Sequence, residues 1–445
     1  MVGALLLVAL GIRIARVEST SYRPANDAKF YLTLASQVAH KGDYANTGVS
    51  AGGAHGPTAY FPPAFPYLLA AVDLIDGHRV PAGAAIEPAR IAQAVLGTAT
   101  AALVGLVAFE VFGAAVALAA LAIAALYPAL VELSATVYAE NLLVPLILAA
   151  IWATLRARRS ARPHRWVAAA GVLTGLATLT HQNGIVVVFT LLPAVWSIRR
   201  GPVLLVAAAI VTLAPWTIRN AIVMHSFIPV SDETGLTLSG TYNPTSANDR
   251  QIPYRWRDIA SIPSEADLFR KAHTLTEPQL DSKLRSRALH YIGHHPVAPL
   301  AAAYHNTRRL LELESSLAWR ASTYNIGIAR SAARVGVLGF WIVALVAAFG
   351  AVTAAARRAP RWLWATPVLL YLSVVFVNAE TPRFRAPIDP FLIMLAACAV
   401  AAAVARARAW LTARSDRGAP VGRDELRTPA AGGLSQLVEV VQSGT

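Results

Sequence analysis

Long apolar stretches alternate with polar loops along most of the chain. Each stretch carries few charges or none and approaches the roughly 20 residues that an α-helix needs to cross a bilayer. The stretches cover residues 2–17, 89–109, 114–131, 133–155, 166–180, 184–198, 202–218, 335–356, 362–378 and 386–405. This pattern predicts an all-α polytopic membrane protein with about ten transmembrane helices.

Two polar segments are too long to be simple connections between spans. Residues 18–88 and 219–332 comprise about 70 and about 110 residues, whereas most connections have only a few. We therefore expect both segments to be structured and to carry function. Together with the spans, they are predicted to form one transmembrane domain over residues 1–405.

The first long segment contains the pattern of a helix that lies in the membrane interface. Tyr31, Leu34 and Val38 recur at helical spacing, and polar residues occupy the opposite face. This periodicity predicts an interfacial helix that begins close to Asp27. A second, short interfacial helix is predicted for residues 68–72.

Basic residues are concentrated in the short loops between the apolar stretches, and the formal net charge is +14. By the positive-inside rule, such loops face the cytoplasm. With ten spans, both termini then lie in the cytoplasm, and the two long segments lie on the outer side of the cytoplasmic membrane. Arg13 and Arg16, near the outer end of the first span, run against the rule. The loop arginines are Arg156, Arg158, Arg159, Arg162, Arg165, Arg199, Arg200, Arg357, Arg358 and Arg361.

The composition, with 56% hydrophobic and 14% charged residues, excludes a soluble enzyme of this length. Because the positive charge lies between spans, nucleic acid is not an expected partner. Cys398 is the single cysteine, so an intrachain disulfide is impossible. Residues 406–445 predict a largely disordered cytoplasmic tail, with at most one short helix at 434–441. The first span starts at Met1 without a basic leader, which leaves a natural start further upstream open.

Asp27 is an acid at the outer face, just beyond the first span. Aspartate is a good N-cap for a helix, and this structural role is one explanation for it. The capping box that would strengthen this role is absent, because Phe30 stands where an acid or glutamine is needed. The other explanation is catalysis on a lipid-borne substrate. The residues alone leave both explanations open.

Glu140 and His181 lie at membrane depth near the outer face. Ionisable residues are costly to bury there, so they are functional candidates by default. Ser134, Tyr138 and Asn141 lie near Glu140 at helical spacing and would share one helical face. The alternatives are a structural pairing of Glu140 with a neighbouring helix and an interfacial hydrogen bond of His181.

Three arginines and two further residues complete the candidates on the outer side. Arg219 ends a span, where the default explanation is snorkelling to the headgroups. Arg383 and Arg385 lie in the loop between the last two spans, where a specific anionic partner explains them better than topology does. His55 lies in a glycine-rich stretch able to fold over a substrate, and Tyr60 opens a stiff aromatic and proline-rich run.

In their order and spacing, these pieces resemble the bacterial members of the GT-C membrane glycosyltransferases. These enzymes are related to the dolichyl-phosphate-mannose protein mannosyltransferases and to the aminoarabinose transferases of lipid A. Two positions depart from the family pattern, since Ala28 and His181 stand where the family often has Glu and Arg. The matching pieces are Asp27 with Tyr31, Gly42 and Tyr44, Tyr60–Pro66, Glu87–Arg90, Ala125–Pro128, Glu140, Gly171–Thr180, Pro215–Asn220 and Arg383–Pro387.

The resemblance implies that a hexose or pentose moves from a polyprenyl-phosphate donor to a lipid, glycan or protein acceptor of the cell envelope, with inversion. Such a transfer needs a base for the acceptor proton and cations for the leaving phosphate. Because arginines can neutralise that phosphate, no cofactor or metal is expected. The implied roles are base for Asp27, donor-phosphate binding for Arg383, Arg385 and Arg219, and sugar or acceptor binding for His55, Tyr60, Glu140 and His181.

Two other classes of protein share many of these features. A transporter or flippase of lipid-linked sugars would have the same spans and basic residues, but transporters bind substrate near the bilayer midplane and often have internal repeats. Here the polar clusters lie toward one surface, and we find no convincing repeat. A non-catalytic relative that binds polyprenyl lipids is the third possibility, kept open by Ala28 after Asp27.

Overall fold

The structure of the protein, a computed structural model, describes residues 1–47, 54–77, 86–314, 327–379 and 382–418. It consists almost entirely of helices, with one antiparallel hairpin of two short strands. Contacts divide the chain into a large unit, Met1–Ala401, and a remainder, Ala402–Thr445. The large unit contains all the features described below, except for the end of the last helix.

Every predicted apolar stretch contains a helix. Among the described residues, α4, α7, α10, α17 and α20 are long and apolar enough to cross a membrane, and the bent pair α5–α6 makes a sixth candidate. The all-α polytopic fold is therefore confirmed, while helix length and hydropathy support fewer than ten spans. The helices are α1 (Val2–Glu18), α4 (Ile86–Phe112), α5 (Ala114–Leu126), α6 (Pro128–Ser134), α7 (Glu140–Ala157), α8 (Pro163–Thr180), α9 (Val186–Val195), α10 (Gly201–Val223), α17 (Arg330–Ala351), α18 (Ala354–Arg358), α19 (Arg361–Val375) and α20 (Asp389–Gly418).

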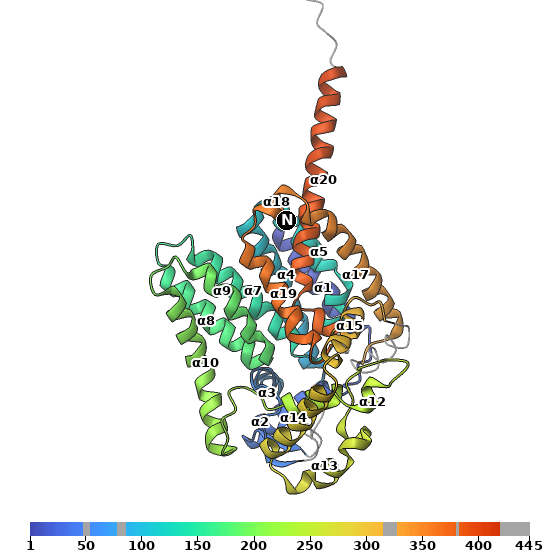
Figure 1. Cartoon of the computed structure of the whole chain (residues 1–445). Coiled ribbons are helices and arrows are strands. Elements are labelled where there is room, and N and C mark those ends of the chain that lie inside the picture. Colours follow the sequence, from blue (N-terminus) through green and yellow to red (C-terminus); the bar gives the residue numbers. More distant parts are fainter. Residues whose placement is uncertain (48–53, 78–85, 315–326, 380–381, 419–445) are drawn as a thin grey trace, which may run out of the picture. The chain divides into compact units, whose positions relative to one another are not determined.

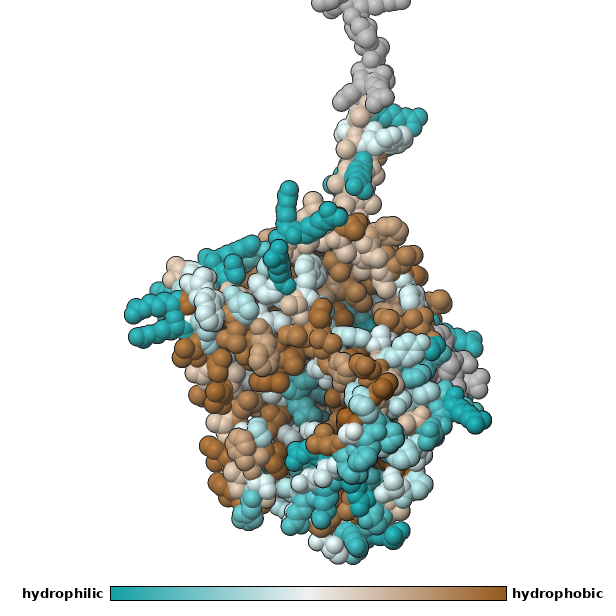
Figure 2. All heavy atoms as spheres, in the orientation of Figure 1, coloured by the Kyte–Doolittle hydropathy of each residue, from teal (hydrophilic) through white to brown (hydrophobic). Residues whose placement is uncertain are grey.

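The predicted basic loops meet at one end of the large unit, with the start of α1 and with α18 (Figure 1). His164, in the first turn of α8 after one basic loop, donates from Nε2 to the carbonyl of Arg199 on the next loop, 2.9 Å away. A hydrophobic belt separates this end from a polar one that holds the long segments (Figure 2). The basic loops thus lie on the same side of the belt. That this side faces the cytoplasm stays a prediction.

Arg13 opposes the positive-inside rule because it is buried inside the protein. α5 and α6 meet at a bend of 54°, where Pro128 lacks the N–H that would continue the helix. Arg13 is fully buried and donates to the carbonyls of Ala124 and Ala125 at 3.2 and 3.1 Å. It also donates to the Ser134 hydroxyl at 3.2 Å. The guanidinium therefore satisfies backbone groups that the bend leaves open.

Arg16 is likewise explained by a partner within the protein. Its guanidinium makes two hydrogen bonds to the carboxylate of Glu132, at 2.7 and 2.8 Å. A two-bond arginine–carboxylate pair of this kind fixes geometry as well as charge. Because both arginines have partners inside the protein, neither indicates which side of the membrane this end of α1 faces.

The two long segments form the polar end of the large unit. Helices occur at both places where interfacial helices are predicted, as α2 (Asp27–Lys41) and α3 (Ala64–Asp76), and the second is longer than predicted. The other elements there are β1 (Ala45–Thr47), β2 (His55–Pro57), α11 (Thr234–Thr241), α12 (Pro244–Ala247), α13 (Ala266–Lys271), α14 (Glu277–His294) and α15 (Ala298–Leu310). Short 3₁₀ turns are η2 (Gln182–Ile185), η3 (Ile259–Ser261), η4 (Pro263–Glu265), η5 (Ala272–Thr274) and η6 (Pro382–Arg385).

Aromatic packing fixes α2 against the proline-rich run. The Tyr31 ring lies 4.7 Å from that of Phe61 and meets that of Phe65 edge-on at 5.0 Å. The run is also tied to the second long segment, because Glu277 accepts hydrogen bonds from the Thr58 hydroxyl and the Ala59 amide, at 2.6 and 2.7 Å. The segments before and after the middle spans are thus one connected scaffold.

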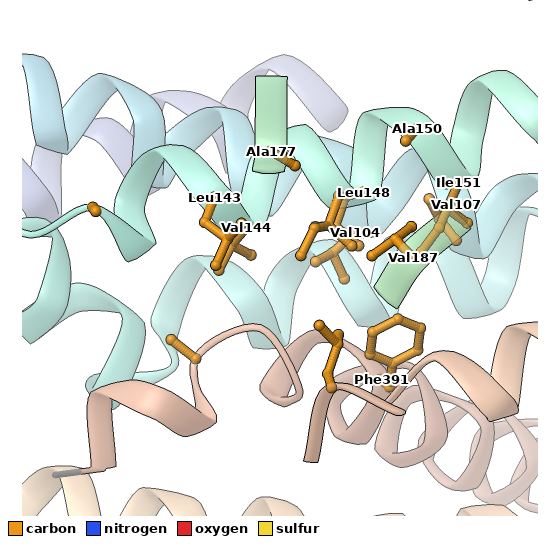
Figure 3. Packing of buried hydrophobic residues seen from close by; sticks show 14 of the residues in the cluster. Val104, Val107, Leu143, Val144, Leu148, Ala150, Ile151, Ala177, Val187 and Phe391 are labelled. Carbon is orange, nitrogen blue, oxygen red and sulfur yellow. The ribbon is translucent and has the colours of Figure 1, made fainter. Parts of the chain in front are cut away.

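A continuous apolar core joins the membrane helices. Val104 of α4, Leu148 and Ile151 of α7, Val187 of α9 and Phe391 of α20 interdigitate there (Figure 3). All of them are at most 1% exposed. Close packing of this kind gives the helix ends that carry the site a rigid support.

Two predicted boundaries are wrong. Ser134, Tyr138 and Asn141 do not share one helix, because α6 ends at Ser134 and α7 begins only at Glu140. The tail begins later than predicted, because α20 continues to Gly418 through alanine and arginine residues that favour helix. The predicted short helix at 434–441 lies outside the described residues.

Candidate active site

A cavity of about 750 Å³ lies at the polar end of the large unit. Its volume is within the range of small-ligand sites. Helix ends and loops from eight separate stretches of the sequence line it, so the fold concentrates polar groups there. They include Asp27, Tyr31, Tyr60, Tyr138, His181, Gln182, Asn183, Glu233, Arg255, Trp256, Arg257, Asp258, Asn378, Arg383 and Phe384.

Asp27 and Arg383 form an ion pair in the wall of the cavity, between residues 356 positions apart. Arg383 Nε also lies 3.6 Å from the carboxylate of Glu140. The guanidinium stands over the Tyr138 ring, 4.4 Å from its centre, and over the Phe384 ring at 4.9 Å. The structure thus brings together Asp27, Arg383 and Glu140, which the sequence predicted separately.

The capping explanation for Asp27 is wrong. The N-cap of α2 is Asn26, and Asp27 is the first residue inside the helix. Asn26 has a φ of 46°, a strained conformation for a residue other than glycine. Within the described residues, no side chain caps α2. The backbone therefore aims the Asp27 carboxylate at Arg383 instead of at the helix amides.

Arg383 is a permanent cation in this site. Burial acts to lower its pKa, but the neighbouring carboxylates of Glu140 and Asp27 outweigh burial and raise the pKa well above the usual value. Its side chain is 12% exposed. A buried arginine with aromatic rings on its faces and two acids at its edge is held in one orientation, suited to an anionic ligand.

Glu233 is a second carboxyl group in the cavity that the sequence analysis did not select. Gln182 Nε2 donates to its Oε1 at 3.0 Å. Burial, and then the negative charge of Asp27, raise the Glu233 pKa to about 8. The sequence contains only a weak indication of Glu233, namely two adjacent acids at 232–233 just before a segment that contains glycine.

His181 is the C-cap residue that follows α8, and it lines the cavity. Its ring meets that of Phe384 edge-on, 6.4 Å between centres. Burial lowers the His181 pKa, which favours the neutral imidazole. The adjacent Asn183 donates to the Ser373 hydroxyl at 3.4 Å. This turn therefore offers neutral donors and acceptors to a polar ligand.

Tyr60 also reaches the cavity, where its ring packs edge-on against that of Phe61 at 4.7 Å. Burial raises the Tyr60 pKa well above the usual value, so the phenol keeps its proton and can donate it in a hydrogen bond. His55 lies in β2, next to the same run, and its side chain is outside the described part of the structure.

The structure does not bring Arg219 to the cavity. Arg219 donates to the carbonyls of Thr58 and Tyr44 at 2.7 and 2.8 Å and stands over the Trp216 ring at 4.8 Å. It therefore fastens the strand that follows α2 to the end of α10. A role in binding the donor phosphate has no geometric support for this residue.

Arg385 is also absent from the cavity wall. It is 3% exposed and pairs with Asp389 at 3.0 Å and with Glu312 at 3.4 Å. Its guanidinium lies 3.7 Å from the centre of the Phe340 ring. These contacts join the start of α20 to α15 and α17, so the geometry gives Arg385 a framework role.

The outer wall of the cavity is formed by residues 255–258, which the sequence analysis did not select. The Trp256 indole packs directly over Gly240, where any larger side chain would overlap it. Arg257 forms an ion pair with Asp249. Aromatic and charged groups beside one another are suited to a polar ligand with apolar faces, as sugars have.

No cluster of three or more His, Cys, Asp or Glu side chains able to hold a metal ion occurs within the described residues. The carboxyl groups of the cavity have separate partners, since Asp27 pairs with Arg383, Glu233 accepts from Gln182 and Asp258 accepts from the Ala260 amide. The arrangement as it stands offers carboxyl groups, a fixed cation and neutral hydrogen-bonding groups.

Comparisons with known proteins agree with this fold. The sequence profile of the dolichyl-phosphate-mannose-protein mannosyltransferase family matches residues 61–218, and no curated protein matches the chain. The oligosaccharyltransferase AglB from Archaeoglobus fulgidus, solved with an inhibitory peptide and a dolichol-phosphate, aligns over 94% of this chain at 13% identity with a TM-score of 0.55. This chain has the GT-C fold. It spans 52% of the length of that AglB chain.

A second GT-C structure is ArnT from Cupriavidus metallidurans bound to undecaprenyl phosphate. It aligns over 90% of this chain and 77% of its own at 16% identity, with a TM-score of 0.42. The resemblance to GT-C membrane enzymes predicted from the sequence is confirmed. At these identities, the likeness shows that the fold is shared. It does not show that the activity is shared, because one fold can carry many functions.

Proposed function

We propose that this protein is a membrane glycosyltransferase that moves a sugar from a polyprenyl-phosphate donor to a hydroxyl group of a cell-envelope acceptor. One observation carries the proposal. A carboxylate, Asp27, and a permanently charged guanidinium, Arg383, face each other in the wall of a cavity of about 750 Å³. These are the two groups that transfer from a phosphate-linked sugar requires.

Asp27 acts as the general base in this proposal. It removes the proton of the acceptor hydroxyl as the oxygen attacks the anomeric carbon, while the bond from that carbon to the phosphate oxygen breaks. A single displacement inverts the configuration at the anomeric carbon. General-base catalysis contributes roughly 10²- to 10⁴-fold to such a step.

Arg383 binds the donor phosphate and neutralises the charge that develops as it leaves. Its pairing with Asp27 and Glu140 holds the guanidinium ready before the donor arrives. An arriving phosphate then competes with Asp27 for Arg383, which frees the carboxylate for its role as base. Donor binding thus prepares the site for the acceptor.

Tyr60, His181 and Glu140 bind the sugar or the acceptor in this proposal. Tyr60 and His181 line the cavity and present neutral polar groups, and Glu140 is 2% exposed beside Arg383. Glu140 contacts Arg383, so Glu140 also affects ligand binding indirectly, by positioning the guanidinium. Which sugar is chosen depends on a few such contacts.

The test is a transfer assay in proteoliposomes that contain the wild-type protein. The substrates are polyprenyl phosphates that carry labelled hexoses or pentoses, with a cell-envelope extract as acceptor. The proposal predicts that one polyprenyl phosphate is released for each sugar transferred. A flippase would move the intact donor across the bilayer, and a lipid-binding protein would leave the donor uncleaved. Either of these results would contradict the proposal.

We also propose that the site faces the outer side of the cytoplasmic membrane and that both termini are cytoplasmic. Cys398 is 1% exposed, so single cysteines can be added without removing it. Ala161→Cys, in a basic loop, and Ser286→Cys, on α14, place exposed thiols at opposite ends of the large unit. In intact cells an impermeant maleimide should label only Ser286→Cys. Labelling of Ala161→Cys alone would reverse the orientation.

A further inference from the structure

Asp27 and Glu233, two of the three described carboxyl groups that line the cavity, come from different parts of the chain. Asp27 begins α2, and Glu233 precedes α11 in the second long segment. They have unlike partners. Asp27 pairs with the Arg383 guanidinium, whereas Glu233 accepts a hydrogen bond from the neutral amide of Gln182 at 3.0 Å. A cation favours an ionised acid far more than a neutral amide does.

The other groups around Glu233 favour its protonated form. Burial has the largest effect on the Glu233 pKa, and the charges of Asp27 and Asp281 raise it further. Arg383 and Gln182 act in the opposite direction and offset only part of this. The phenols of Tyr31 and Tyr60, which also interact with Glu233, keep their protons. With a pKa of about 8, Glu233 carries a proton at neutral pH.

Two carboxyl groups in one cavity, one paired with a guanidinium and the other buried against a neutral amide, are the arrangement of an acid–base pair. We propose that Glu233 is a second catalytic residue, which gives its proton to the leaving phosphate while Asp27 accepts the proton of the attacking hydroxyl. This inference rests on the proposed function. It assigns to Glu233 a role in the chemical step, beyond binding.

The step balances in atoms and charge. The acceptor oxygen forms a bond to the anomeric carbon, and the bond between that carbon and the phosphate oxygen breaks with its electron pair going to the phosphate. Asp27 gains a proton and Glu233 loses one. The donor, a phosphate diester with one negative charge, thereby becomes a singly protonated phosphate monoester with one negative charge. Transfer of the proton from Asp27 to Glu233 through water restores the enzyme.

The first test is the Glu233→Gln variant in the proteoliposome transfer assay, measured between pH 6 and pH 10. The substitution keeps the shape of the side chain and removes the transferable proton. We expect kcat to fall about 100-fold, the lower end of the general-acid range, because Arg383 still stabilises the phosphate. The donor KM should change less than threefold. Asp267→Asn, which alters an exposed acid of α13, is the matched control and should keep wild-type activity.

The pH profile separates a catalytic role from a structural one. Wild-type kcat should fall as pH rises through about 8, where Glu233 loses its proton. Gln182→Leu removes a hydrogen bond that favours the ionised form, so it should raise the Glu233 pKa and move this decline to higher pH. A wild-type rate that rises through this range would make Glu233 a base and overturn the proposal. The proposal would also be overturned if kcat of Gln182→Leu declined at the same pH as kcat of the wild type.

The outcomes distinguish this inference from the proposed function. Wild-type transfer together with full activity of Glu233→Gln would refute the role of Glu233 and leave the glycosyltransferase proposal intact. Failure of the wild-type protein to cleave any polyprenyl-phosphate sugar would refute both. If Glu233→Gln does not fold, the shift expected for Gln182→Leu decides the matter.

Discussion

Replacing Arg383 is the perturbation whose outcome the structure specifies best. Arg383→Gln removes the only guanidinium that lines the cavity in contact with Asp27 and Glu140, within the described residues. A hydrogen bond to a charged group is worth about 1.5–3 kcal/mol. Since about 1.4 kcal/mol corresponds to tenfold in affinity, polyprenyl phosphate should bind roughly 10- to 150-fold more weakly. The measured loss should lie toward the lower value, because the phosphate must displace Asp27 from the wild-type arginine.

The same substitution should destabilise the fold. Removing one partner of a buried ion pair lowers the free energy of unfolding by about 3–5 kcal/mol. Because the Asp27 side chain is 31% exposed and water screens its charge, we expect about 2–3 kcal/mol here. Thermal unfolding in detergent measures this loss. Asp27→Asn combined with Arg383→Gln should recover part of it, because the uncompensated carboxylate is then gone.

The assay is a titration of the folded, purified protein in nanodiscs with short-chain polyprenyl phosphate. Arg383→Lys is the matched control, which keeps the charge but cannot contact a phosphate through two nitrogens. Its affinity should lie between those of the wild type and Arg383→Gln. Arg385→Gln should lower stability and leave the affinity of the folded protein unchanged. An unchanged affinity in Arg383→Gln would refute the phosphate role.

Two further predictions concern packing. Gly97→Ala should lower the unfolding free energy by about 1–3 kcal/mol, because its Cβ would overlap the Ser134 hydroxyl at the end of α6. Gly336→Ala, which has no atom nearer than 4.0 Å, is the control for thermal unfolding, and equal effects of the two would contradict the packing account. Gly240→Ala should displace the Trp256 indole in the cavity wall and raise the KM of a substrate up to roughly tenfold in the transfer assay. Unchanged KM values for both donor and acceptor would contradict a binding role for Trp256.

Much of the fold could be predicted because lipid imposes simple rules on the sequence. Apolar stretches located the helices, and the spacing of Tyr31 and Leu34 located α2, whose buried face they occupy. Arg13 runs against the positive-inside rule because the rule concerns charges in water, while this guanidinium satisfies backbone carbonyls inside the protein. The bend at Pro128 that requires it is not apparent from hydropathy.

The site could be predicted only in part. Asp27 stood out as an acid at the outer face just beyond the first span, and Arg383 stood out as an arginine in an outer loop, where topology does not explain it. Arg385 stood out for the same reason, yet the turn of η6 sends one arginine to the cavity and buries the other against Asp389. Glu233 was missed because its importance comes from a tertiary contact with Gln182, to which no local pattern points. Sequence spacing shows which residues share a helix face, but not which segments meet.

The central claim is that Asp27 accepts a proton during cleavage of a polyprenyl-phosphate sugar. The most direct measurement compares the wild type and Asp27→Asn in proteoliposomes, with polyprenyl phosphate released and sugar transferred both counted. Asp27→Asn should bind polyprenyl phosphate at least as tightly as the wild type, since no carboxylate then competes for Arg383. Its kcat should fall by roughly 10²- to 10⁴-fold. Full transfer activity in a folded Asp27→Asn protein would contradict the claim.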